Sequence, residues 1–482
     1  MHLLNAIPGG AATSDGAVDL GQTPGDIVIL SAADTELAAL SSALSSLPDD
    51  FPRLRLANLL QLGHPYAVDL YVESVIQHAR LVIVRLLGGQ SYWAYGVERL
   101  SDLCRARGIL LAFLPGDRQP DPGLDGFSTV DDEARAMLFE YFREGGIENL
   151  QNCLRRAAAM IGRAEDPPPA RPLPAAGIYW PGLHDPDLDS LRPEWNALHH
   201  GARAGPRPVA AIVFYRALMQ AGDLAAVDAL VQALSAEGLN PLPIYVTSLK
   251  DRLSADIVGT LLDHALPDVI LNATSFALGT PTGGDSSIDD PLGQCDCPVL
   301  QVVFATQPRD DWANGTRGLN PRDLAIAVAL PEIDGRIMTR AVAFKAEAQF
   351  DTRTECSIVR LQPDHGRCSY VAKFACAWSR LGRLSPAERK IAVVMANYPN
   401  RDGRIGNGVG LDTPQSVVEI LRAMKDAGYE LNALPVSGNR LIEALIEGVT
   451  NDFASSAGRR VRVVYPLALY RRFFETLPAA IR

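Results

Sequence analysis

Short apolar runs alternate with helical patterns along the first 163 residues of the chain. Apolar runs at 26–34 (DIVILSAAD), 81–89 (LVIVRLLGG) and 109–117 (ILLAFLPGD) predict strands, and helical patterns lie between them. Buried strands separated by helices are typical of a parallel sheet with helices on its faces. A further helix is predicted over 132–162, so residues 1–163 are expected to form an N-terminal α/β domain.

A proline-rich tract, AEDPPPARPLPA (164–175), follows this first segment. Proline removes the backbone N–H donor, so the tract predicts a semi-rigid linker without a helix or strand. We therefore place a domain boundary here. The tract is also expected to be a protease-sensitive hinge that releases a folded piece of about 160 residues.

The α/β alternation resumes over 176–340, the predicted second α/β domain. A helix closed by Gly238 separates its first two predicted strands. Asn320 and Pro321 begin another predicted helix, which is expected to end at Pro331. The strands are predicted at 208–216, 241–251, 267–277 and 297–305.

The third segment, 341–482, is expected to be the start of a further, incomplete α/β domain. A strand is predicted at 390–400 (KIAVVMANYPN), a helix from Thr413 to Gly428, and a strand at YELNALPV directly after it. The predicted fold class is therefore α/β, with several Rossmann-like parallel-sheet lobes joined by linkers.

Composition excludes some functions for these 482 residues. A formal net charge of −11 argues against a nucleic-acid partner, which would favour a basic surface. No apolar stretch approaches the ~18 residues of a membrane span, and the N-terminus resembles no secretory signal, so a cytoplasmic location is expected. Seven scattered cysteines suit reduced thiols. The pair Cys295 and Cys297 lacks the second ligand pair of a zinc site and is interpreted as incidental.

No nucleotide-binding loop is found in the sequence. None of its five lysines lies in the pattern G-x-x-x-x-G-K-[ST], whose backbone amides and lysine hold phosphates. The chain is therefore not expected to bind or hydrolyse ATP.

Aromatic residues and a histidine are grouped in the first segment. His64 precedes a proline at a predicted helix start, and Tyr92, Trp93 and Tyr95 lie in the segment LLGGQSYWAYG. Aromatic faces and an imidazole suit a flat macrocycle, by stacking or axial contact. Alternatively, the histidine is a structural hydrogen-bonding residue and the aromatic side chains cover a domain interface.

Two carboxylates, Glu332 and Asp334, lie in the turn PEIDGRI. They suit the acceptance of ring-nitrogen protons or the binding of a hard cation. The alternative is a turn braced by salt bridges to Arg336 or Arg340. Other polar residues follow predicted strands, where α/β folds often bind ligands, but spacing alone does not decide their role. They are Ser248, Lys250, Asn272, Thr274 and Ser275.

A long glycine-rich loop, NYPNRDGRIGNGVGLDTP (397–414), is predicted between a strand and a helix. Asn397, Asn407 and Asp412 are candidates to face a ligand or another domain, or to hold the loop itself together. A shared tetrapyrrole cleft would require the loops near His64, Trp93, Glu332 and Asn397 to converge on one concavity.

Seven blocks of sequence resemble the large subunit of aerobic cobaltochelatases, in that family's order from residue 62 to about 416. They resemble less well the porphyrin-binding large subunit of magnesium chelatase, which belongs to the same wider family. The blocks are LGHPYAVDLYVESVI, RLLGGQSYWAYGVERL, VFYRALMQAGD, PIYVTSLKD, LNATSFA, GLNPRDLAIAVALPEIDGRI and NYPNRDGRIGNGVGLDTPQSV.

The resemblance implies a subunit that binds the corrinoid hydrogenobyrinic acid a,c-diamide and inserts Co²⁺ as substrate. It implies two partners, an AAA+ subunit that uses ATP and Mg²⁺ and a subunit with an integrin-I-like domain. Large subunits of the family are longer than this chain, so an inactive N-terminal fragment is expected, with catalytic residues beyond residue 482 and no metal ligands assigned. The alternatives are a magnesium chelatase large subunit that binds protoporphyrin, and a non-catalytic tetrapyrrole-binding protein.

Overall fold

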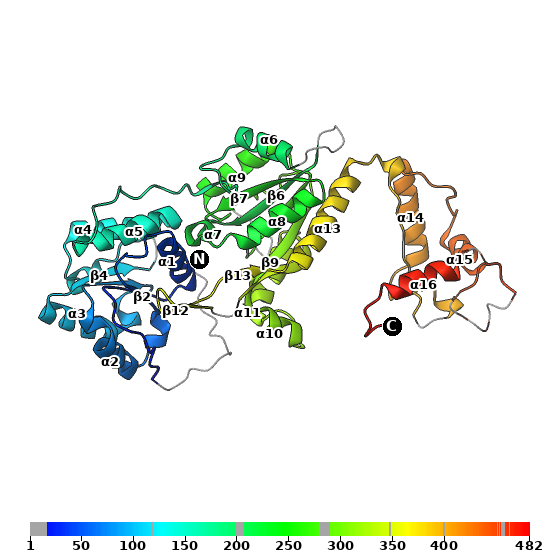
Figure 1. The fold of residues 1–482 in the computed structure, drawn as a ribbon. Coiled ribbons are helices and arrows are strands. Elements are labelled where there is room, and N and C mark those ends of the chain that lie inside the picture. The colour runs from blue at the N-terminus through cyan, green and yellow to red at the C-terminus, as the bar shows by residue number, and fades with distance from the viewer. Residues whose placement is uncertain are drawn as a thin grey trace. The chain divides into compact units, whose positions relative to one another are not determined.

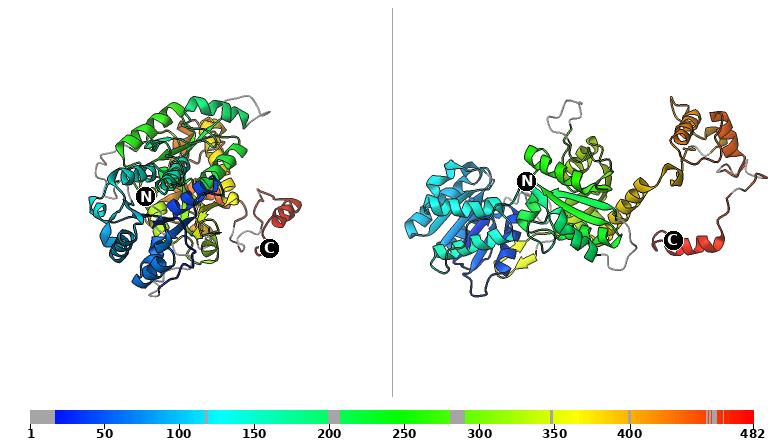
Figure 2. Two further views of the ribbon diagram at one scale, coloured as in Figure 1. Left: turned by 60° about the vertical axis from the view of Figure 1, so that its left-hand side comes forward. Right: turned by 90° about the horizontal axis from the view of Figure 1, so that it is seen from above.

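The protein divides into two units by its internal contacts, Met1–Ser379 and Arg380–Arg482, and each is described by itself. The first unit contains two parallel sheets with helices on their faces (Figures 1 and 2), which confirms the predicted α/β fold class. The computed structural model describes residues 17–116, 119–198, 207–279, 290–346, 349–398, 401–450, 452, 454, 458–461 and 463–482.

The first lobe is built on a four-stranded, fully parallel sheet in the order β2-β1-β3-β4. Nearly every strand residue is buried, which explains why the strands are almost continuous apolar runs rather than alternating ones. The strands are β1 (Ile27–Ser31), β2 (Leu54–Asn58), β3 (Leu81–Leu86) and β4 (Leu110–Pro115).

Helices cover both faces of the first sheet (Figure 1): α1, α4 and α5 pack on one face, and α2 and α3 on the other. The single helix predicted over 132–162 is two helices, because Gly145 and Gly146 have φ values of 68° and 85°, which end a right-handed helix. The elements are α1 (Asp34–Ser45), η1 (Leu59–Leu62), α2 (Pro65–Ser74), η2 (Ile76–His78), η3 (Gln90–Tyr92), α3 (Ala94–Arg107), η4 (Pro122–Phe127), α4 (Asp132–Glu144) and α5 (Ile147–Met160).

The second lobe is built on a seven-stranded sheet in the order β13-β10-β9-β8-β6-β7-β5. The five central strands are parallel, and the two edge strands are antiparallel to their neighbours. All four predicted strands of this segment form. The strands are β5 (Ala176–Ile178), β6 (Val209–Tyr215), β7 (Asn240–Val246), β8 (Val269–Asn272), β9 (Val299–Pro308), β10 (Ile337–Lys345) and β13 (Leu361–Pro363).

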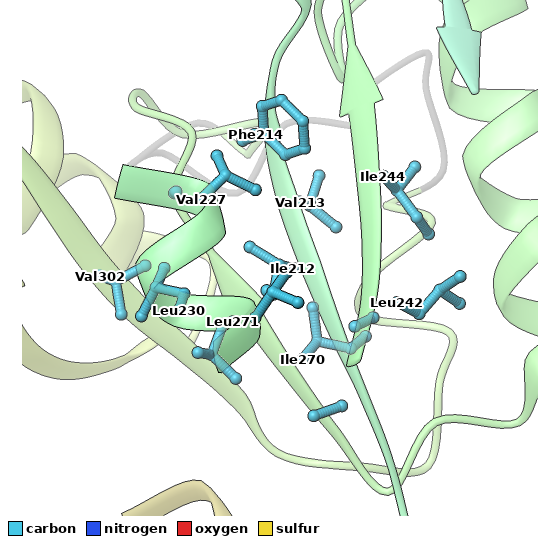
Figure 3. Packing of buried hydrophobic residues seen from close by; sticks show 14 of the residues in the cluster. Ile212, Val213, Phe214, Val227, Leu230, Leu242, Ile244, Ile270, Leu271 and Val302 are labelled. Carbon is cyan, nitrogen blue, oxygen red and sulfur yellow. The ribbon is translucent and has the colours of Figure 1, made fainter. Parts of the chain in front are cut away.

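Apolar side chains of the second lobe form one large core. Figure 3 shows Val227 and Leu230 of α8 packed beside Leu271 and Val302 of the sheet. Helices α8 and α13 lie on one face of this sheet and α9 on the other (Figures 1 and 2). The helices are α6 (Leu188–Ala197), α7 (Arg216–Ala221), α8 (Ala225–Ala236), α9 (Arg252–Ala265), α10 (Arg309–Asn314), α11 (Pro321–Leu324), η5 (Ala325–Ala329), α12 (Leu330–Ile333) and α13 (His365–Arg383).

The two sheets share a strand order. In each, the first parallel strand lies between the second and the third: β2-β1-β3-β4 in the first lobe, and β7-β6-β8-β9 in the second. The second parallel strand therefore lies on one side of the first, and the third lies on its other side. Such a reversal opens a crevice at the carboxyl ends of the two strands concerned, which is the usual ligand position in doubly wound folds.

The helix predicted to end at Pro331 continues past it. Asn320 caps its start as expected, with its side chain accepting from the N–H of Asp323 at 2.8 Å. A π-helical turn over Ala325–Ala329 then shifts the hydrogen-bond register, which places Pro331 in the first turn of α12, where no N–H donor is needed. The helix ends at Ile333.

A hairpin of the second half of the unit returns to the first lobe. We call residues 349–358, which contain β11 (Gln349–Asp351) and β12 (Cys356–Ile358), the clasp. Cys356 and Ile358 are buried in the core of the first lobe. Arg353 donates to the carbonyl of Leu44 at 2.6 Å. The clasp and β10 thus belong with the first unit, whereas the sequence placed the start of a third domain at 341.

The second unit contains helices but, among its described residues, no strand. The strands predicted at 390–400 and YELNALPV do not form there, and Asn397 makes only an isolated bridge to Ile405. A strand needs a neighbouring ladder for its N–H and C=O groups, and Val394 is 92% exposed instead. The predicted helix after Asp412 forms as α14. The helices are η6 (Pro386–Glu388), η7 (Asp402–Arg404), α14 (Thr413–Asp426), α15 (Gly438–Ile446) and α16 (Leu467–Glu475).

The proline-rich tract 164–175 is partly held against the first lobe. Asn149 of α5 donates to the carbonyl of Arg171 and accepts from its N–H, both at 2.9 Å. The hydroxyl of Tyr141 donates to the carbonyl of Pro168 at 2.5 Å. The tract is therefore attached to the first lobe at both Pro168 and Arg171, which should slow its cleavage relative to a free linker.

We expect Asn149→Ala to release the second half of the tract and to speed its cleavage several-fold. Limited proteolysis with mass spectrometry of the products would measure this. Asn152→Ala is the matched control, because Asn152 is a buried asparagine of the same helix whose side chain bonds Arg155 and, among the described residues, no residue of the tract. Equal cleavage rates in the two variants would contradict the prediction.

Candidate functional site

A cavity of about 320 Å³ lies at the carboxyl ends of β6, β7 and β8. This is the position where the strand order of the second sheet reverses, and we call the cavity the switch-point pocket. Several of the strand-end residues that spacing alone left undecided line it together. Those residues are Ser248, Lys250, Asn272, Thr274 and Ser275.

Tyr215, the last residue of β6, fixes one wall of the switch-point pocket. Its hydroxyl donates to the carbonyl of Ser275 and accepts from the N–H of Ser275, both at 3.0 Å. Burial raises the pKa of the Tyr215 phenol, so the hydroxyl stays protonated and keeps both bonds over the physiological pH range. The loop after β8 is therefore attached to the end of β6.

The same loop is held from the other side by the π-helical turn and α12. Phe276 has a φ of 71°, a left-handed conformation that is costly for a residue with a side chain. Its N–H donates to the carbonyl of Ile326 in the π-helical turn at 2.7 Å. The Asp334 carboxylate accepts from the N–H groups of Leu278 at 2.8 Å and Gly279 at 2.9 Å. The pocket wall is thus built in advance of any ligand.

Two cationic side chains line the switch-point pocket. Arg336 is buried, and one terminal nitrogen of its guanidinium bonds Asp290 at 2.6 Å. Lys250 is exposed at the rim and makes no ion pair with any residue in the part of the chain that the structure describes. Its backbone N–H donates to the Ser248 hydroxyl at 3.1 Å, which orders the rim locally.

The equivalent position in the first lobe is filled. Arg85, at the end of β3, pairs with Glu36 at 2.9 Å and lies over the Phe142 ring at 4.9 Å. A cavity of only about 10 Å³ remains between the ends of β1 and β3, which is about the room that one water molecule needs. The switch point of the second lobe has the larger cavity, about 320 Å³, against about 10 Å³ between β1 and β3 and about 120 Å³ beside the Arg85–Glu36 pair.

Two smaller cavities adjoin the switch-point pocket and share Tyr215 with it. One, of about 120 Å³, lies between the lobes and is lined by Arg85 and Arg216. The other, of about 80 Å³, is apolar and is lined by Phe304 and Ile326. Tyr215, at the carboxyl end of β6, thus lines all three cavities.

His64 caps a helix. Its Nδ1 accepts from the N–H of Tyr66 at 3.1 Å at the start of α2, which is the structural role that the sequence left as an alternative. Tyr92 and Tyr95 are both exposed. The Tyr95 hydroxyl donates to Asp69 at 2.7 Å and, with Arg99, holds the pKa of that carboxyl below its usual range.

The Trp93 indole is a core residue of the first lobe and has no free face for stacking. It is 6% exposed, and its Nε1 donates to the carbonyl of Leu62 at 2.7 Å. The aromatic grouping seen in the sequence exists, but its largest ring is turned inward because it fills the space between α3 and the loop before α2.

The carboxylates predicted in the turn after α12 differ in position. Asp334 lines the switch-point pocket, whereas Glu332 is exposed and lines none of the cavities described above. The arginines expected to brace the turn bond elsewhere: Arg336 pairs with Asp290, and the Arg340 guanidinium lies 3.4 Å from the centre of the Tyr370 ring.

The residues predicted in the glycine-rich loop lie in the second unit. Asp412 caps α14 and accepts from the N–H of Gln415 at 3.1 Å, and Asn407 is exposed. Convergence of Asn397 with the first unit stays a prediction. Within the first unit, none of the cavities described above is lined by His64 or Trp93.

Sequence reasoning missed Tyr215, Phe276 and Arg336 as pocket residues. Tyr215 carried a usable signal, because it ends a predicted parallel strand. Phe276 and Arg336 carried none, since their roles depend on a left-handed backbone and on a distant carboxylate.

The cysteines are expected to differ in the reactivity of their thiols. A hydrogen bond from Cys297 lowers the pKa of Cys295, whereas burial raises the pKa of Cys104 and Cys153 to about 12. The thiolate is the reactive form, so Cys295 should be alkylated first near neutral pH. Iodoacetamide labelling with peptide mass spectrometry would test this. Labelling of Cys104 as fast as Cys295 would contradict it.

The fold and pocket define a class of protein: a doubly wound α/β protein with a cavity at the switch point of its second sheet. The family model described as CobN/Magnesium Chelatase matches residues 139–482. This chain belongs to that family. No helix in the described part of the chain is long and apolar enough to cross a bilayer.

Relatives support this assignment over the whole chain. The aerobic cobaltochelatase subunit CobN of Sinorhizobium sp is 47% identical over 100% of this chain, and that of Pseudomonas aeruginosa is 42% identical over 99%. A magnesium-chelatase subunit of Cereibacter sphaeroides is 25% identical over 81% of this chain and 32% of its own length. The solved structure of the catalytic subunit of cobaltochelatase from Mycobacterium tuberculosis matches with a TM-score of 0.69 and 30% identity, over 94% of this chain and 35% of that one. The chain spans 37% of the length of the two CobN relatives.

Proposed function

We propose that this chain forms part of the large, tetrapyrrole-binding subunit of an ATP-dependent cobaltochelatase of aerobic cobalamin biosynthesis. The substrates are Co²⁺ and hydrogenobyrinic acid a,c-diamide. The observation that carries the proposal is the identity of 47% to a cobaltochelatase subunit over the whole chain, against 25% to a magnesium-chelatase subunit. A cytoplasmic location fits the seven free cysteines.

The role proposed for residues 1–482 is to bind and orient the ring, and not to carry out metal insertion alone. The switch-point pocket around Tyr215 offers a built wall with cationic and hydroxyl groups. Among the described residues, no group of three or more histidine, cysteine, aspartate or glutamate side chains is placed to hold a metal ion. Insertion is assigned to the part of the relatives' length that this chain does not span.

ATP hydrolysis is assigned to a partner, an AAA+ subunit that binds ATP with Mg²⁺ and works with a third subunit that has an integrin-I-like domain. The absence of a phosphate-binding loop motif from the sequence supports this division. We expect the purified chain to show neither ATPase activity nor micromolar affinity for ATP. Robust hydrolysis by a clean preparation would contradict the division.

A chimaera would test the proposed function. Residues 1–482 would replace the matching part of the Sinorhizobium relative, and cobalt insertion would be assayed with that organism's partner subunits. We expect insertion of cobalt into the corrinoid to be retained. Insertion of magnesium into protoporphyrin instead would favour a magnesium chelatase.

Binding measured by difference spectroscopy distinguishes the proposed subunit from the remaining alternative. A non-catalytic tetrapyrrole-binding protein should bind the ring tightly with residues 1–482 alone, whereas the proposed subunit should bind it weakly. Difference spectra with a corrinoid and with protoporphyrin would measure both affinities and show which ring is preferred.

A further inference from the structure

The two lobes have the same strand order, but their switch points differ in how much of the crevice side chains occupy. In the first lobe, the Arg85–Glu36 pair closes the crevice with its own cation and anion. In the second lobe, the crevice keeps about 320 Å³ and has a cationic side chain at its rim without an ion-pair partner among the described residues. The first lobe thus provides an internal comparison in which an ion pair occupies the crevice, whereas the second lobe has the larger cavity there.

The open crevice favours an anionic group. The Asp334 carboxylate already accepts one backbone N–H on each oxygen, and Asp290 is neutralised by Arg336. Among the described residues, Lys250 is the cation on this pocket without an ion-pair partner, and the buried Arg336 guanidinium lies on the same pocket with further N–H donors. A fork of N–H donors matches the planar oxygens of a carboxylate.

The volume of the pocket limits the size of the group that it can bind. A volume of about 320 Å³ lies at the lower end of the range for small-molecule pockets, so a carboxyalkyl arm fits better than a whole macrocycle. The hydroxyls of Ser248 and Ser275 add donors beside the two cations.

We propose that the switch-point pocket binds a carboxylate group between Lys250 and Arg336, and that its occupant is a peripheral carboxylate arm of the corrinoid ring. The choice of the ring as the source of the carboxylate rests on the proposed function. The pocket then acts as a subsite that fixes the ring by its edge, away from the metal.

Binding of hydrogenobyrinic acid a,c-diamide to the chain 1–482 tests the subsite, with the parent and two charge-reversal variants. Lys250→Glu removes the rim cation, and Lys373→Glu, at an exposed lysine of α13 that does not line the pocket, is the matched control. We expect Lys250→Glu to weaken binding about tenfold and the control to bind like the parent. The same ring with its carboxyls esterified should bind the parent and Lys250→Glu equally.

Competition between the ring and a small carboxylate shows whether the pocket recognises carboxylates in general. Succinate that competes with the ring in the parent, but not in Lys250→Glu, would support a general carboxylate subsite. Equal ring affinity in the parent and Lys250→Glu, or equal losses in both variants, would overturn the proposal. Competition by inorganic phosphate but not by succinate would also overturn it. Cobalt insertion by the chimaera is a separate readout, so the proposed function can fail or hold independently of Lys250.

Discussion

Lys345→Met is expected to lower the free energy of unfolding by about 3–5 kcal/mol. The Lys345 ammonium lies 2.9 Å from Asp34, and both side chains are only 7% exposed. The pair joins the last residue of β10 in the second lobe to the first residue of α1 in the first. Removal of the lysine leaves the Asp34 carboxylate buried, with the Asn58 amide at 2.9 Å as its remaining side-chain donor among the described residues.

Chemical denaturation followed by tryptophan fluorescence would measure this loss. The double variant Asp34→Asn with Lys345→Met removes both charges and should recover most of the stability, because no unpaired charge remains. Arg192→Met is the exposed control. Its pair with Asp189 is 73% and 85% exposed, so its loss should cost less than about 1 kcal/mol. A similarly small loss for Lys345→Met would show that the buried pair does not join the lobes.

Trp93→Ala is expected to be a stability variant, with a loss of about 3–5 kcal/mol. The indole fills the core beside α3, and its removal leaves a cavity and a buried Leu62 carbonyl without its donor. Thermal and chemical denaturation would measure the loss. Tyr92→Ala, at the neighbouring and exposed ring, should change stability by less than about 1 kcal/mol.

Ring affinity distinguishes this interpretation from the stacking role first considered for Trp93. At a temperature where the variant remains folded, we expect unchanged affinity for the corrinoid. A five- to tenfold loss of affinity, about 1 kcal/mol, with normal stability would restore the stacking role.

Sequence patterns found the central strands because both faces of a parallel sheet are buried. Strands such as β1 and β6 are nearly continuous apolar runs, as expected for strands buried on both faces. Strand β2 was missed because its sequence LRLAN contains Arg55, whose buried guanidinium bonds Thr23 at 2.7 Å and also Glu355 of the clasp at 2.8 Å. That partner lies 300 residues away along the chain, and no local pattern reports it.

The site was predictable only in part, for the same reason. Parallel-strand ends indicated where polar residues gather, and Asp334 was identified as a candidate. The shape of the pocket depends on the left-handed Phe276 and on the π-helical turn that accepts its N–H. These features arise from tertiary packing, so periodicity and motif spacing do not contain them.

The clasp makes the first lobe depend on sequence that the ribosome adds late. Cys356 packs in the same core as Ile161, but it lies about 200 residues later in the chain. At ~5–20 residues per second, Cys356 is synthesised about 10–40 s after Ile161. Until then, the flank of α1 that receives the clasp is uncovered on the nascent chain. Chaperone contact with nascent chains is therefore expected to last longest between these two points of synthesis, and to end once the hairpin has emerged.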